Sequence, residues 1–263
     1  MIGSKALSTL KHRFPRLWME TKLRFERSGF EPEFWMIPLV CTNRQDAIDI
    51  GANMGEFSFL MSKTARQVIA FEPNADLKPY LQRLLSSNCR IETIALSSGS
   101  GTASLRIESH DSGGATIEEK NPLGWVENGQ DVSSRTIQKR TLDSYDLNNI
   151  SFIKIDVEGH EESVVAGGLQ TLRRNMPVLL IESEDRHNQG APARLAKVLA
   201  EFGYCGFFVK HGVLTDLSLI RREDVEVENL RKDRASYVNN FIFVPNGRED
   251  IVSSLKRLWP ARS

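Results

Sequence analysis

Short apolar runs alternate with segments of helical periodicity from residue 46 onward. The apolar runs predict seven strands near residues 46–50, 67–71, 91–94, 151–155, 177–182, 204–209 and 240–244. The periodic segments predict helices near residues 55–64, 76–87, 160–174 and 191–202. Because strands that alternate with helices pack mainly as parallel neighbours, the pattern predicts an α/β fold. We expect a mostly parallel, seven-stranded twisted sheet with helices on both faces.

A glycine turn follows the first predicted strand. Residues 49–55 read Asp-Ile-Gly-Ala-Asn-Met-Gly, and Glu72 ends the second strand, 21 positions after Gly51. An acid at that strand end usually binds a ribose diol. A dinucleotide turn needs G-x-G-x-x-G, but here Asn53 and Glu56 occupy the second and third glycine positions. A carboxylate would repel a pyrophosphate at the helix N-terminus, so the turn favours a ligand without phosphates.

Seven motifs in order along the chain extend this interpretation. They are Asp49-Ile-Gly-Ala-Asn-Met-Gly55, Phe71-Glu-Pro73, Ile94-Ala-Leu-Ser97, Thr141-Leu-Asp143, Ile153-Lys-Ile-Asp-Val-Glu-Gly-His-Glu161, Pro177-Val-Leu-Leu-Ile-Glu182 and Asn240-Phe-Ile-Phe-Val-Pro245. Over roughly residues 45–245 the chain resembles the FkbM family of S-adenosylmethionine-dependent methyltransferases. The resemblance implies a Rossmann-like methyltransferase fold with S-adenosylmethionine as the cofactor. It also implies O-methylation of a small molecule or glycan, typically a sugar or polyketide-type hydroxyl.

The turn and the resemblance together indicate which residues contact the cofactor. They are Asp49, Gly51, Ala52, Asn53, Gly55, Glu72, Pro73, Ala95, Leu96 and Asp156. Small residues in the turn leave room for the methionine portion. Glu72 is expected to accept hydrogen bonds from both ribose hydroxyls. The resemblance places Ala95 and Leu96 beside the adenine.

Carboxylates at the ends of two strands are the candidate catalytic groups, because an aliphatic hydroxyl must lose its proton during methylation. Asp156 and Glu158 lie two positions apart and project to the same side of a continuing strand, and Glu182 ends the next strand. Further candidates at this edge are His160, Glu184 and His187. The same carboxylates could bind magnesium, but no metal-binding motif is present and we assign no metal ligand.

Charge and composition narrow the possible partners and the compartment. The 263 residues contain 34 basic and 34 acidic side chains, which argues against a nucleic-acid-binding surface over the whole protein. Cys41, Cys89 and Cys205 form no C-x-x-C pair, which favours a reducing cytoplasm. No apolar run approaches the roughly 18–20 residues needed to span a bilayer. We therefore expect a soluble cytoplasmic protein that binds no nucleic acid and has no transmembrane segment.

Two segments depart from the main pattern, which occupies residues 43–263. Residues 1–42 form a basic arm with apolar positions at helical spacing, which Pro15 interrupts or restarts. Four roles for this arm are open: packing on the domain, covering the acceptor site, forming a homodimer contact, or adsorbing to anionic lipid. Residues 99–140 contain two alternating runs that predict an antiparallel hairpin, and we interpret the insertion as a wall of the acceptor site or a solvated loop.

Two other functions stay open at this point. An NAD-linked Rossmann dehydrogenase would share the broad fold, but Asn53 and Glu56 count against it. A non-catalytic module that binds the cofactor without turnover is the second alternative. Retention of Asp156 together with Glu158 counts against that alternative.

Overall fold

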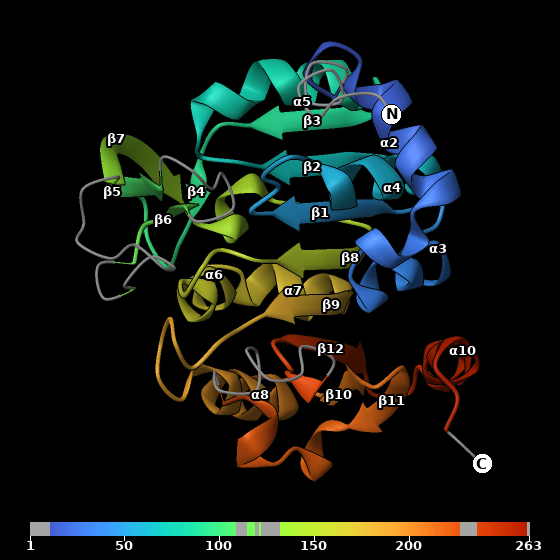
Figure 1. The fold of residues 1–263 in the computed structure, drawn as a ribbon. Helices are drawn as coiled ribbons and strands as arrows, with labels where there is room; N and C mark the ends of the chain where they lie inside the picture. The colour runs from blue at the N-terminus through green and yellow to red at the C-terminus, as the bar shows by residue number, and fades with distance from the viewer. Residues whose placement is uncertain (1–10, 109–114, 119–120, 122–131, 227–235, 262–263) are drawn as a thin grey trace.

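The computed structural model describes residues 11–108, 115–118, 121, 132–226 and 236–261. Within these residues the chain is built around an eight-stranded mixed sheet (Figure 1). Its strands, in spatial order, are β11 (Val213–Asp216), β10 (Tyr204–Lys210), β12 (Asn240–Pro245), β9 (Val178–Glu182), β8 (Ile150–Ile155), β1 (Asp46–Ile50), β2 (Val68–Phe71) and β3 (Cys89–Glu92).

The sheet corrects the prediction of seven mostly parallel strands. From β3 to β9 neighbouring strands are parallel, but β12 runs antiparallel to β9 and to β10, and β11 adds an antiparallel edge. All seven predicted strands occur, so the error concerns one missed strand and the direction of the last pairs. The missed strand follows a hairpin turn at His211 and Gly212, both with positive φ (50° and 73°). Two successive positive φ values are what tight hairpins require, yet His-Gly is a weaker sequence signal than Asn-Gly.

Helices cover both faces of this sheet, as predicted. They are α2 (Pro15–Phe25), α3 (Ile37–Val40), α4 (Glu56–Thr64), α5 (Lys78–Leu84), α6 (Glu161–Ala166), α7 (Leu169–Asn175), α8 (Ala191–Glu201) and α10 (Glu249–Leu258). The predicted helix over 160–174 is divided into α6 and α7 at Gly167 and Gly168. A Cβ at Gly167 would lie 2.1 Å from the Ser97 main-chain oxygen, so the chain needs glycine at this close approach.

Alternate residues of the central strands feed two separate hydrophobic cores. In β8, Phe152 packs with residues of α3, α4 and α10, whereas Ile153 packs with residues of α6, α7 and α8. Strands buried on both faces read as continuous apolar runs, and this is why the sequence identified them. Polar side chains in these strands gather near the carboxyl ends, where the candidate site lies.

A second, four-stranded sheet stands beside the carboxyl ends of β1, β2 and β3 (Figure 1). It has the order β4 (Ala95–Leu96), β7 (Val132–Arg140), β5 (Gly101–Glu108) and β6 (Ala115–Thr116). Strands β5 and β7 are antiparallel, as the alternating pattern predicts. The interpretation of residues 110–114 and 122–125 as part of the acceptor wall lies outside the described residues.

The described part of the N-terminal arm packs on the domain. Pro15 occupies the first turn of α2, where its missing N–H costs little, so it starts the helix. Helix α2 contacts α5, and Lys22 Nζ lies 2.7 Å from Glu56 Oε1. Phe14, Leu17 and Phe25 remain exposed. The lid, homodimer and lipid interpretations stay predictions. No helix among the described residues combines the length and apolar character that crossing a bilayer requires.

Candidate functional site

A cavity of about 590 Å³, including space open to solvent, lies between the carboxyl ends of the central strands and the small sheet. We call it the cofactor cavity. Seven of the ten predicted cofactor residues line it: Gly51, Asn53, Glu72, Pro73, Ala95, Leu96 and Asp156. These residues come from four separate motifs, which the fold brings to one place.

The other three predicted cofactor residues support the cavity from behind. Asp49 is fully buried and accepts a hydrogen bond from the Ser58 hydroxyl at 2.5 Å. Burial raises the pKa of the Asp49 carboxyl. Ala52 packs in a hydrophobic cluster beside α5, and Gly55 begins α4 with a φ of 76°. None of the three lines the cofactor cavity, and their contact with the ligand stays a prediction.

Gly51 is required by contacts within the protein itself. Its φ is 81°, and a Cβ at this position would lie 1.7 Å from the main-chain oxygen of Asp156. Gly55 is similar, because a Cβ there would lie 2.6 Å from Leu81 Cδ2. The sequence argument for small residues invoked room for a ligand. The structure adds that the β1 turn also needs glycine to approach the end of β8.

Glu72 lies at the base of the cofactor cavity and shapes the glycine turn. One carboxylate oxygen accepts the Asn53 N–H at 2.7 Å, and the other accepts the Asn74 N–H at 2.8 Å. Burial raises the pKa of Glu72 to about 7, although these two N–H donors oppose the shift. Each carboxylate oxygen can accept a further hydrogen bond. Glu72 can therefore orient the turn and still bind a ligand diol.

A buried lysine that the sequence argument missed balances the acids behind the cavity. Lys154 is 4% exposed, and its Nζ lies 2.8 Å from Asp156 Oδ2. Burial lowers the pKa of Lys154, but the charges of Asp156 and Asp49 outweigh this effect and the net shift is upward. Lys154 therefore stays charged. The sequence does place this lysine within the apolar run 150–155. Because a lysine is rarely buried unless it is paired, its position there could have indicated an acidic partner.

Glu158, which lines the cofactor cavity, pairs with the buried His187. Glu158 has a φ of 53°, and its Oε2 lies 3.1 Å from His187 Nε2. Burial raises the pKa of Glu158 and lowers that of His187 to about 4, so both groups favour their neutral forms at pH 7. The Glu158 main-chain oxygen accepts hydrogen bonds from Thr116 Oγ1 (2.8 Å) and Asn121 Nδ2 (2.6 Å). The small sheet thus holds the loop that carries Glu158.

His160 also lines the cofactor cavity, within a second hydrogen-bonded group. Its Nδ1 lies 3.2 Å from Glu118 Oε2 and its Nε2 lies 2.9 Å from Ser97 Oγ. Burial lowers the pKa of His160. Ser97 is only 1% exposed, so it cannot reach a substrate as a nucleophile. Ser97 and Glu118 orient the imidazole, and sequence spacing gave no sign of this contact between distant segments.

A second, larger cavity lies on the α4 side of the same sheet edge. It measures about 2190 Å³, including space open to solvent, and we call it the acidic cavity. It is bounded by residues 28–34 of the arm, the start of α4, the end of β9, the β10–β11 turn and residues 237–240. The carboxyl-bearing residues that line it are Glu31, Glu33, Glu56, Glu182 and Glu184.

Two of these acids differ sharply in their surroundings. Burial raises the pKa of Glu182, which accepts a hydrogen bond from Asn239 Nδ2 at 2.8 Å. Burial would raise the pKa of Glu184 too, but hydrogen bonds from Arg186 and Tyr237 reverse the shift and lower it to about 2. Of the three predicted catalytic carboxylates, Asp156 and Glu158 line the cofactor cavity, whereas Glu182 lines the acidic one. Across the described ranges, no group of three or more His, Cys, Asp or Glu side chains is arranged to hold a metal ion.

Comparisons with known proteins connect these features to a family. The family model for the methyltransferase FkbM domain matches residues 49–209. No curated protein matches the chain. A methyltransferase FkbM from Methylobacillus flagellatus is 15% identical with a TM-score of 0.50, over 83% of this chain and 46% of that one. An rRNA methylase from Streptococcus thermophilus is 12% identical (TM-score 0.43, 81% and 95% covered). A Streptococcus mutans protein in complex with S-adenosylhomocysteine is also 12% identical (TM-score 0.45, 81% and 97% covered). The first of these structures supports the fold, and this chain spans less than half of its length.

Proposed function

This chain belongs to the FkbM methyltransferase family, and we propose that it transfers a methyl group from S-adenosylmethionine to a hydroxyl of a small molecule or glycan. The observation that carries the proposal is the meeting of the Gly51 turn and Glu72 at one cavity, which residues of the predicted adenine segment also line. That arrangement suits a nucleoside ligand, because a diol can bind the carboxylate while the turn leaves space beside it.

The residues of the cofactor cavity fit a cationic ligand. Glu72, Asp156 and Glu158 line it, and burial raises the pKa of both Glu72 and Glu158. A positive charge nearby would favour the ionised carboxylates and lower these pKa values. S-adenosylmethionine carries a sulfonium and an ammonium group and has no phosphate. We therefore propose that Glu72 binds the ribose, that Ala95 and Leu96 flank the adenine, and that Asp156 faces the methionine portion.

The acidic cavity is the proposed acceptor site. It opens at the same sheet edge and contains Glu182, whose pKa is raised by burial and also by the charges of Asp156 and Glu158. The acids that line the cofactor cavity thus affect the pKa of an acid that lines the acidic cavity. An acceptor in this cavity would lie beside the carboxyl groups of its lining.

The cofactor supplies an electrophilic methyl group on sulfur. In this transfer the acceptor oxygen would form the new C–O bond, the C–S electron pair would return to sulfur, and the hydroxyl proton would pass to a carboxylate. We propose that Glu182, ionised beside the positive charge of the bound cofactor, takes the proton, with Asp156 in the neighbouring cavity. The ion pair with Lys154 holds the Asp156 carboxylate in place. Alignment of the acceptor oxygen by the cavity walls would supply much of the rate enhancement.

Calorimetric titration with S-adenosylhomocysteine and with NAD tests the cofactor. We expect S-adenosylhomocysteine to bind and NAD not to bind. Glu72→Gln should weaken the binding of S-adenosylhomocysteine by about 10–150-fold, because the lost hydrogen bonds to a charged group are worth about 1.5–3 kcal/mol. The control is Glu92→Gln, also at a strand end but paired with Arg90 at 2.5 Å and outside the cofactor cavity.

Three outcomes would contradict the proposal. Binding of NAD in preference to S-adenosylhomocysteine would favour a dehydrogenase. Equal affinities in wild type and Glu72→Gln would remove the ribose assignment. Tight binding of the cofactor without methyl transfer to any hydroxyl acceptor would favour a non-catalytic module. The cytoplasmic location and the homodimer stay predictions, which cell fractionation and light scattering can test.

A further inference from the structure

The acidic cavity contains buried carboxyl groups that lack a cation. Within it, Glu56 pairs with Lys22 at 2.7 Å, and Glu184 pairs with Arg186 at 2.6 Å. Among the residues that the structure describes, Glu33 has no lysine or arginine within ion-pair distance, and neither has Glu182. Glu33 is 4% exposed, and burial raises its pKa to about 8. Both groups would ionise more readily beside a positive charge.

A residue that lines the same cavity has an amide oxygen without a hydrogen-bond partner. Asn240 is 6% exposed, lines the acidic cavity, and pairs directly with Glu182 across β12 and β9. Its Nδ2 donates to Glu31 Oε2 at 3.4 Å, but its Oδ1 has no hydrogen-bond partner. Buried acceptors without a donor cost free energy, so a ligand that supplies donors at this point would be favoured. This observation is independent of the charges.

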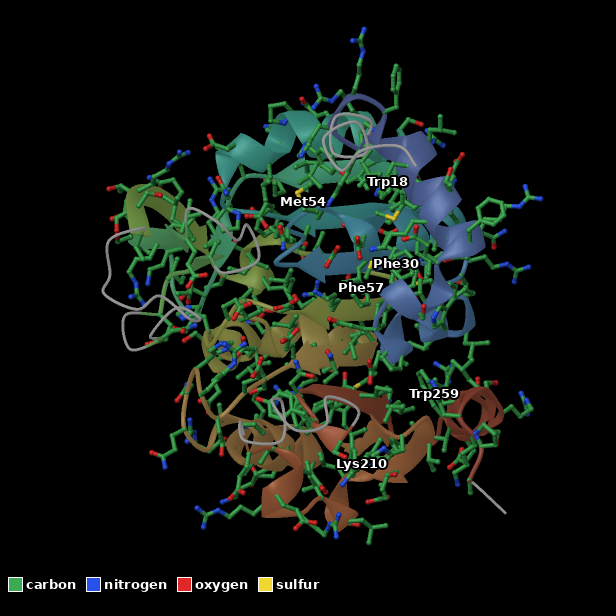
Figure 2. The ribbon with its side chains drawn as sticks, in the orientation of Figure 1. Trp18, Phe30, Met54, Phe57, Lys210 and Trp259 are labelled. Atoms are coloured by element: carbon green, nitrogen blue, oxygen red, sulfur yellow. The ribbon has the colours of Figure 1, made fainter. Side chains whose placement is uncertain are left out.

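Aromatic side chains also line the cavity. Phe30, Phe34 and Phe57 line it, and Figure 2 shows Phe30 and Phe57 near one another between the arm and the central sheet. The rings of Phe30 and Phe34 are stacked with centroids 4.4 Å apart. Lys22 Nζ already lies 4.2 Å from the centroid of the Phe30 ring, and Lys154 Nζ lies 4.7 Å from that of Phe57. The apolar rings suit the C–H face of a sugar ring or a short carbon chain. The cavity lining thus combines apolar rings with hydrogen-bond acceptors.

Deepening the function proposed above, on which it rests, we propose that the acidic cavity binds an acceptor with a protonated amine close to the hydroxyl to be methylated, as in an amino sugar or amino alcohol. An ammonium group has three N–H donors and no acceptor, which matches Glu33, Glu182 and the Asn240 oxygen. A neutral hydroxyl in its place offers one donor and no charge. Because a neutral carboxyl must ionise to pair with the ammonium group, binding near pH 7 releases a proton.

Two probes that differ at one group test the inference. Serinol and glycerol share a three-carbon skeleton, and serinol carries an ammonium group where glycerol carries a hydroxyl. Each is titrated by ligand-observed NMR against the protein saturated with S-adenosylhomocysteine at pH 7. We expect serinol to bind at least about tenfold more tightly, a difference of about 1.4 kcal/mol. Calorimetry of serinol in two buffers with different heats of ionisation should show proton release.

Variants locate the effect. Glu33→Gln and Glu182→Gln should each remove most of the preference for serinol and change the affinity for S-adenosylhomocysteine less than twofold. The matched control, Glu249→Gln, changes an exposed acid on α10 and should leave both affinities unchanged. Having two variants keeps the test informative if one of them fails to fold.

Several results would overturn this inference. They are equal binding of the two probes, no detectable serinol binding, and a serinol preference that survives both substitutions. If Glu33→Gln and Glu182→Gln instead weaken S-adenosylhomocysteine strongly, the acids serve the ammonium group of the cofactor and not an acceptor. Failure of S-adenosylhomocysteine to bind wild type would count against the proposed function itself. Normal cofactor binding without a serinol preference would count against this inference alone.

Discussion

Replacing Lys154 with methionine is the sharpest test of how the site is held together. The substitution keeps the length of the side chain and removes its charge. Lys154 Nζ lies 2.8 Å from Asp156 Oδ2, and Asp49 faces Lys154 across the β1–β8 pair. Asp49 is fully buried, and its Oδ1 has no hydrogen-bond partner. Lys154→Met therefore leaves the buried Asp49 and the partly exposed Asp156 without their shared cation.

The expected cost follows from this burial. Removing one partner of a buried ion pair typically costs about 3–5 kcal/mol, because the remaining charge is left uncompensated. For a chain of this size that loss corresponds to a fall in Tm of roughly 6–20 °C. An exposed pair should behave differently, since surface pairs contribute about 0–1 kcal/mol. Lys63, whose Nζ lies 3.1 Å from Glu20 Oε1 on the surface, provides the control as Lys63→Met.

The pH dependence separates lost charge from lost packing. Burial already raises the pKa of Asp49 in the folded protein, and without Lys154 the pKa of this carboxyl should rise further. A group whose pKa is raised by folding binds more protons in the native state, so stability increases as pH falls through the folded pKa. The deficit of Lys154→Met relative to wild type should therefore shrink between pH 7 and pH 5.

Urea unfolding followed by circular dichroism at both pH values measures this deficit. Wild type, Lys154→Met and Lys63→Met are compared under identical conditions. A deficit below about 1 kcal/mol at pH 7 would place Lys154 among ordinary surface lysines and refute the argument. A large deficit that does not change with pH would attribute the loss to packing and not to uncompensated carboxylates.

Three further outcomes follow from the geometry of the site. Gly51→Ala should lower the free energy of unfolding by at least about 3 kcal/mol in a thermal melt, because it combines a positive φ with a 1.7 Å clash. Gly212→Ala, at a positive φ in open space, should lower it by only about 1–2 kcal/mol. The pKa of His187 is lowered to about 4, so its imidazole should stay neutral in NMR spectra from pH 8 to pH 5. The free energy of unfolding should fall as pH drops from about 6.5 towards 4, because the unfolded chain then binds more protons. Protonation of His187 near pH 6.5 would contradict its pairing with Glu158. Thr116→Val removes the hydroxyl that donates to the Glu158 carbonyl, so S-adenosylhomocysteine should bind about 2–10-fold more weakly in calorimetry, and unchanged binding would separate the small sheet from the cofactor cavity.

Local sequence patterns predicted the elements whose burial is continuous. The apolar runs of β8 and β9 identify strands because both of their faces are covered by helices. Features that depend on distant contacts were missed. The break between α6 and α7 results from the approach of Gly167 to the Ser97 carbonyl, 70 positions earlier in the chain. No periodicity within the helix reports that contact.

The same distinction applies to the site. Gly51 and Glu72 could be recognised because a turn and a strand end carry their own residue requirements. The hydrogen bonds of His160 to Glu118 and Ser97 join segments that only the insertion brings together. Likewise, Lys154 is informative only once the register of its strand is known. Side-chain pairs across strands depend on that register, which a single sequence does not state.

The register of β1 and β8 explains why two motifs of this chain belong together. Asp49 lies opposite Lys154, and the Asp156 N–H donates to the Ile50 carbonyl at 2.9 Å. The main-chain carbonyl of the same Asp156 occupies the space that a side chain at Gly51 would need. The glycine of one motif and the acid of the other are therefore parts of one packed unit. A change in either motif should disturb cofactor binding through the other, and a Gly51→Ala variant that folds should also alter the environment of the Asp156 carboxylate.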